Sequence, residues 1–124
     1  MNKVISVISV IGVLVLLSGC APSGNATACG SYAAAYNELA DAVAAGEDRD
    51  GLLQIMDDMD LAIDKALLTA TGEVRVQITA SRDAVILVVP TDTGEAGINF
   101  FYSTTRVASA CSDSGNPINL HDLK

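Results

Sequence analysis

Apolar and polar residues alternate with the period of an α-helix through most of the chain after residue 28. From about 29 to 45, 50 to 70 and 93 to 111, apolar residues recur at intervals of three and four, the spacing of one helix face. These positions are Cys29, Tyr32, Tyr36, Leu39, Ala40 and Val43; Leu52, Met56, Met59, Ile63, Ala66, Leu67 and Ala70; and Gly97, Phe100, Thr104, Val107, Ala108 and Cys111. The pattern predicts three helices with these residues on their buried faces.

The segment 73–89 fits two different patterns. Its residues Val74, Ile78, Ser81, Val85 and Val88 have helical spacing. However, residues 74–79 alternate as a strand does, and 85–89 is a run rich in β-branched residues that suits a buried strand. A short apolar run does not distinguish helix from strand by its period alone. The segment is therefore either a further helix or a β-hairpin, and Pro90 ends it in both cases.

The predicted helices have recognisable ends. Gly46 follows the first helix, as glycine commonly does at a C-terminus. Asp92 and Glu95 have the spacing of a capping box in front of the last helix. Gly115 and Pro117 close that helix, and a short tail follows. The apolar residues of the tail that can pack back on the helices are Ile118, Leu120 and Leu123.

The N-terminus has the organisation of a secretory signal. Met1–Lys3 is a short basic start, and 4–17 is an apolar run interrupted only by two serines and a glycine. This run is shorter than the roughly 20 apolar residues that a membrane-spanning helix needs. Small residues follow it, ending in Leu17-Ser18-Gly19-Cys20. A basic start, a short apolar stretch and small residues together indicate export from the cytoplasm.

Leu17-Ser18-Gly19-Cys20 resembles the lipobox of bacterial lipoproteins. The resemblance implies cleavage after Gly19, a diacylglyceryl group on the Cys20 thiol and acylation of the new amino terminus. Because stable anchoring takes two or more acyl chains, such a lipid replaces a transmembrane helix. We therefore expect a signal peptide at 1–19, a flexible lipid-anchored tether at 20–28 and one small helical domain at 29–124. The expected location is the extracytoplasmic face of the cell membrane.

The two remaining cysteines favour an all-α fold. Export places Cys29 and Cys111 in an oxidising compartment, where such a pair normally forms a disulfide. The bridge requires their Cα atoms to lie within about 7 Å. In an up-down bundle, an even number of passes brings the start of the first helix and the end of the last together. We therefore predict an all-α, up-down four-helix bundle closed by one disulfide. The alternative is an α+β fold with a hairpin at about 73–89.

Charge and motifs exclude several functions. The chain of 124 residues has a formal net charge of −8, which opposes binding to nucleic acid and electrostatic adhesion to anionic lipid. Its only histidine, His121, lies in the tail, and no GxSxG or phosphate-binding glycine motif occurs. We therefore predict no catalytic residues, no enzymatic activity and no cofactor.

Acidic residues lie on one face of the second predicted helix. Asp57, Asp60 and Asp64 are separated by three and four residues, with Asp58 beside them. Calcium prefers several carboxylate oxygens, but side chains on one helix diverge and the chain has no DxDxDG loop. We expect a solvated acidic face and no metal site.

The run Phe100-Phe101-Tyr102 places two phenylalanines about 100° apart on a helix, so both cannot point straight at the core. A broad buried face is the commonest use of such residues. The alternative is an apolar surface for a partner, formed by Phe101 and Tyr102.

The combination of lipobox, short tether and one cysteine near each end of a helical domain is similar to small alanine-rich lipoproteins of actinobacteria and their phages. The matching residues are 17–20, Cys29 and Cys111. Some phage-encoded lipoproteins block superinfection. The favoured hypothesis is a non-catalytic, membrane-tethered module that binds a protein of the cell envelope. The alternatives are a prophage immunity lipoprotein and a carrier of a small apolar ligand.

Overall fold

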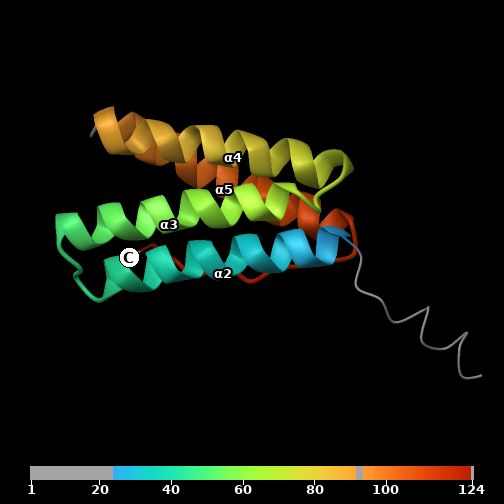
Figure 1. Ribbon diagram of the computed structural model, residues 1–124, viewed down its shortest axis with the longest axis horizontal. Helices are drawn as coiled ribbons and strands as arrows, with labels where there is room; N and C mark the ends of the chain where they lie inside the picture. The colour runs from blue at the N-terminus through green and yellow to red at the C-terminus, as the bar shows by residue number, and fades with distance from the viewer. Residues whose placement is uncertain (1–23, 92–93, 124) are drawn as a thin grey trace, which may run out of the picture.

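Four consecutive helices account for the periodic part of the sequence. The computed structural model describes residues 24–91 and 94–123, without the side chains of 87–91. The helices are α2 (Gly24–Ala44), α3 (Arg49–Leu67), α4 (Gly72–Thr91) and α5 (Gly94–Asp113), and no strand occurs in these described ranges. They run up and down side by side as a four-helix bundle (Figure 1). The predicted fold class is confirmed.

The ambiguous segment is a helix because of the side chains that it buries. Val74, Ile78 and Val85 are at most 2% exposed and Ser81 is fully buried, which is helical spacing. In a strand, Val76 would share a face with Val74 and Ile78, yet its exposed fraction is 57%. The hairpin alternative is therefore wrong. Helix α4 ends at Thr91, one residue beyond Pro90; the side chain of Val88 lies outside the described part.

The first helix begins earlier than predicted. We expected a flexible tether at 20–28, but 24–28 forms the first turn of α2, and Ala28 is fully buried. The cause is tertiary packing, which pattern and composition do not report. Gly24 lies directly against the carbonyl of Thr69, leaving no room for a side chain between them. Residues 1–19 and 20–23 lie outside the described part, and so does Asp92 of the predicted capping box.

The core is formed along the whole length of the bundle. Helix α2 packs mainly on α3, and α5 packs mainly on α4, so that the bundle consists of two helical hairpins. The largest fully buried side chains are Tyr32, Tyr36, Met59, Ile63, Ile78, Val74, Val85 and Val107. Of the positions predicted to face the core, Val43, Leu52, Met56, Leu67 and Ala108 are only partly buried, and Gly97 is exposed.

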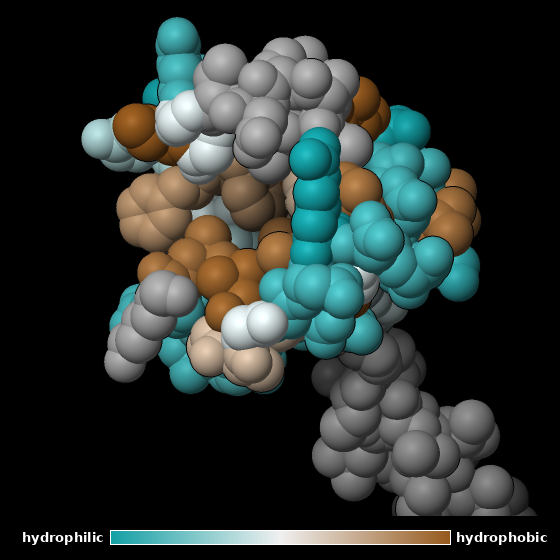
Figure 2. All heavy atoms as spheres, turned by 90° about the vertical axis from the view of Figure 1, so that its left-hand side faces the viewer, coloured by the Kyte–Doolittle hydropathy of each residue, from teal (hydrophilic) through white to brown (hydrophobic). Residues whose placement is uncertain are grey.

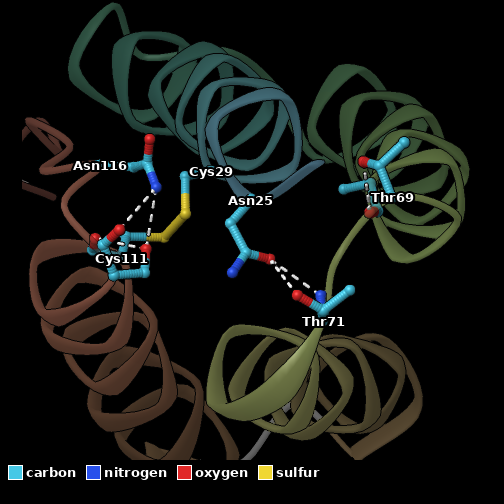
Figure 3. Close-up of a disulfide and its surroundings, with 8 residues drawn as sticks. Asn25, Cys29, Thr69, Thr71, Cys111 and Asn116 are labelled. Carbon is cyan, nitrogen blue, oxygen red and sulfur yellow. Dashed lines mark hydrogen bonds between the residues drawn. A yellow bond between two sulfur atoms is a disulfide. The ribbon is translucent and has the colours of Figure 1, made fainter. Parts of the chain in front are cut away.

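A disulfide joins the two hairpins. Cys29 of α2 and Cys111 of α5 are bonded, with their Cα atoms 5.9 Å apart (Figure 3). Both residues are at most 1% exposed. The predicted pairing is confirmed, and the bond crosslinks the pair of helices that share few other contacts.

The C-terminal tail returns along α2. The side chain of Asn37 donates a hydrogen bond to the carbonyl of Asn119 (3.0 Å) and accepts one from the backbone N–H of His121 (2.7 Å). Ile118 and Leu120 pack against the core, as the sequence predicted. Leu123 remains 37% exposed. One amide side chain therefore holds two backbone groups of the tail.

Asn25 caps the start of α4 from another helix. Its Oδ1 accepts hydrogen bonds from the backbone N–H of Thr71 (2.8 Å) and from the Thr71 hydroxyl (3.3 Å) (Figure 3). We expect Asn25→Ala to lower the free energy of unfolding by about 1 kcal/mol, because a helix-terminal N–H loses its acceptor. Asn25→Asp keeps the oxygen and should stay close to the wild type. Urea unfolding of the Cys20→Ser chain measures both; equal losses in the two variants would contradict the capping role.

Candidate partner-binding surface

Three large apolar side chains lie together on the outer side of α5. Ile98, Phe101 and Tyr102 have exposed fractions of 57%, 50% and 60%. Phe101 and Tyr102 lie three and four residues after Ile98, so all three are neighbours on the helix surface. The rings of Phe101 and Tyr102 meet edge to face, with their centroids 6.3 Å apart. We call these three residues the α5 surface.

The helical twist separates the two phenylalanines. Phe100 is 4% exposed, and its ring centroid lies 6.1 Å from that of Tyr36 in the core. Phe101 is turned about 100° further around the helix and is half exposed. The expectation of a core role is therefore confirmed for Phe100 and wrong for Phe101 and Tyr102. The latter two have the exposure that a partner surface requires.

The α5 surface lies away from the beginning of α2. We call the end of the bundle with Gly24 and the α3–α4 turn the Gly24 end, and the opposite end, where α5 begins, the far end (Figure 1). Ile98 and Phe101 belong to the first two turns of α5 and so lie near the far end. Figure 2 views this end and shows apolar atoms gathered around a recess, with hydrophilic residues at the border.

The charges divide unequally between the two halves of the bundle. Among the described residues, the far half holds two arginines, Arg49 and Arg82 (the latter at mid-length), and most of the acidic residues: Glu38, Asp41, Glu47, Asp48, Asp50, Asp57, Asp58, Asp83, Glu95 and Asp122. The half at the Gly24 end is nearly balanced, with Asp60, Asp64, Glu73 and Asp113 against Lys65, Arg75 and Arg106. The α5 surface therefore lies in the acidic half of the molecule.

An arginine occupies part of the acidic face of α3. Arg82 of α4 pairs with Asp60 through Nε (3.3 Å) and with Asp64 through Nη1 (3.1 Å). Asp57 and Asp58 point into solvent. No group of three or more His, Cys, Asp or Glu side chains that could hold a metal ion occurs among residues 24–91 and 94–123. The carboxylates at 60 and 64 thus neutralise an arginine.

The buried polar groups of the core are paired. The Tyr32 hydroxyl lies 2.6 Å from the Ser81 hydroxyl, and both residues are fully buried. Burial raises the pKa of Tyr32 well above its ordinary value, and the hydrogen bond with Ser81 offsets only part of this. Tyr32 is therefore a neutral hydrogen-bonding group. His121 in the tail is exposed, and its Nδ1 lies 2.7 Å from a carboxylate oxygen of Asp41 on α2.

No helix in the described part of the chain is both long and apolar enough to cross a membrane. Comparison with protein-family models, curated proteins and solved structures found no match. The fold itself defines the class of protein, a small up-down four-helix bundle closed by one disulfide.

Proposed function

We propose that this protein is a bacterial membrane lipoprotein, anchored through lipid on Cys20, whose helical domain is a non-catalytic module that binds a protein partner in the cell envelope. The observation that carries the proposal is the α5 surface. Two aromatic rings and an isoleucine are half exposed together on a helix. Exposed aromatic anchors of this kind commonly dominate the binding energy of protein interfaces.

The position of the α5 surface suits recognition at a membrane. It lies near the far end of the bundle, while α2, which follows Cys20 in the sequence, begins at the Gly24 end (Figure 1). A partner could reach Phe101 while the lipid holds the other end. Helix α5 is held at both ends, because Phe100 beside this surface packs on Tyr36 of α2 and Cys111 in the last turn is bonded to α2. A preformed, rigid surface loses little conformational entropy on binding.

Two further observations support the proposal. A buried disulfide suits an exported protein, because cytosolic reductants keep most thiols reduced. The polar side chains weighed for catalysis or metal binding have other partners: His121 pairs with Asp41, and Asp60 and Asp64 pair with Arg82. The acidic half of the bundle favours a partner with cationic residues around an apolar centre.

A photo-crosslinker at Phe101, in the full chain expressed in bacterial cells, tests the partner surface. We expect one specific protein adduct from this position. The same probe at Asp58, an exposed residue of α3, is the matched control and should give no such adduct. Tyr102→Ser should reduce the adduct several-fold without changing the urea midpoint, because the side chain is exposed. Similar adducts from both positions, or none from Phe101, would contradict the proposal.

The anchor has its own control in the same cells. Cys20→Ser should move the protein out of the membrane fraction, and the N-terminal peptide of the unsubstituted protein should carry the mass of its acyl chains. An unmodified Cys20 in a chain that is exported and oxidised would overturn the lipoprotein assignment, whatever the crosslinking result.

A further inference from the structure

The connection between Cys20 and the bundle is short. Helix α2 begins at Gly24, four residues after Cys20, and four residues span at most about 14 Å. The bundle is about 30 Å long, as the 21 residues of α2 require. A lipid on Cys20 therefore keeps the Gly24 end close to the membrane.

An exposed leucine lies at this end. Leu68 begins the turn between α3 and α4 and is 83% exposed, the highest value among the large hydrophobic side chains that the structure describes. The turn lies beside the start of α2, because Gly24 packs on Thr69 and Asn25 binds Thr71. Leu68 is thus held next to the point where the chain leaves for Cys20.

Two cations flank Leu68. Lys65 lies in the last turn of α3 and is exposed. Arg75 lies in the first turn of α4, where its Nη1 donates a hydrogen bond to the carbonyl of Leu67 (2.7 Å). Long cationic side chains beside an apolar residue suit the boundary between acyl chains and phosphate headgroups.

We propose that the α3–α4 turn is a membrane-contact site, at which Leu68 enters the bilayer interface while Lys65 and Arg75 meet anionic headgroups. This inference rests on the lipid anchor proposed above. The bundle then stands end-on, with the α5 surface facing away from the membrane. A side-on arrangement brings the acidic far half against the same headgroups, where like charges repel. The nearly balanced Gly24 end avoids that repulsion.

Tryptophan reporters test the arrangement, because the chain contains no tryptophan of its own. Leu68→Trp, Leu61→Trp and Tyr102→Trp all replace exposed side chains. Leu61 lies on the same face of α3 as Leu68 but about 10 Å further from the turn. Each lipidated full-length protein is reconstituted into vesicles of phosphatidylglycerol and phosphatidylethanolamine with brominated acyl chains, which quench tryptophan only at short range.

We expect strong quenching at position 68, several-fold weaker quenching at 61 and none at 102. Equal quenching at 61 and 68 would indicate that α3 lies flat on the bilayer and would overturn the end-on arrangement. Absence of quenching at position 68 would contradict the proposed membrane contact of the α3–α4 turn. The mass of the N-terminal peptide separates the two proposals: acylated Cys20 without quenching at 68 contradicts only the membrane contact, whereas unmodified Cys20 contradicts the lipid anchor.

Discussion

Reduction of the Cys29–Cys111 disulfide is expected to lower the free energy of unfolding by about 4 kcal/mol. The bond closes a loop between residues 82 apart in the sequence, and the chain-entropy model assigns a large effect to so long a loop. It also joins α2 to α5, which otherwise pack mainly within separate hairpins. Urea unfolding of the Cys20→Ser chain, with and without reductant, measures the loss.

The double variant Cys29→Ala/Cys111→Ala is the matched control for this experiment. It should unfold at a lower urea concentration than the oxidised protein, close to the reduced one, and reductant should not change its midpoint. The same midpoint for oxidised and reduced protein would contradict the expected stabilisation. A shift of the double variant by reductant would show that the reagent acts elsewhere.

Ser81→Ala is expected to destabilise the bundle by about 1–3 kcal/mol, because it leaves the Tyr32 hydroxyl buried without its partner. Tyr32 and Ser81 belong to α2 and α4, and both are fully buried. Removing both hydroxyls in Tyr32→Phe/Ser81→Ala should cost less than the sum of the single changes, since neither polar group is then left alone. Ser109→Ala, at an exposed position of α5, is the control and should have little effect. Additive losses would contradict the coupling.

The burial of Tyr32 also predicts that the free energy of unfolding depends on pH in the alkaline range. Burial raises the pKa of Tyr32, and it also raises that of Tyr36. The unfolded chain therefore loses these protons first, near the ordinary tyrosine pKa of about 10. Below that pH the stabilisation is fully present; above it, the burial of Tyr32 makes stability fall by about 1.4 kcal/mol per pH unit, and Tyr36 adds to the loss in the same direction. Urea midpoints above pH 10 should fall less steeply for Tyr32→Phe, and identical slopes would contradict this origin.

The periodic helices and the disulfide could be predicted because they depend on the spacing and type of residues, which the sequence shows directly. Ile63 and Met59 are fully or almost fully buried, as the spacing of apolar residues in α3 required. The cysteine pairing followed from the predicted export signal and two cysteines, and it favoured an even number of passes without excluding the hairpin. The tether was predicted too long, because α2 is extended to Gly24 by contacts with residues more than 40 positions away.

The sequence alone therefore determined where helices can form, which face of each is apolar and which cysteines pair, since these depend on near neighbours and on compartment. Only the tertiary structure decided that 72–91 is a helix, that Phe100 enters the core and Phe101 does not, and that Leu68 is exposed beside Gly24. The physical reason is that burial depends on what the rest of the chain covers. A short β-branched run or an aromatic pair has the same local preference whether it is buried or exposed. Packing between the two hairpins decides which of its side chains are buried.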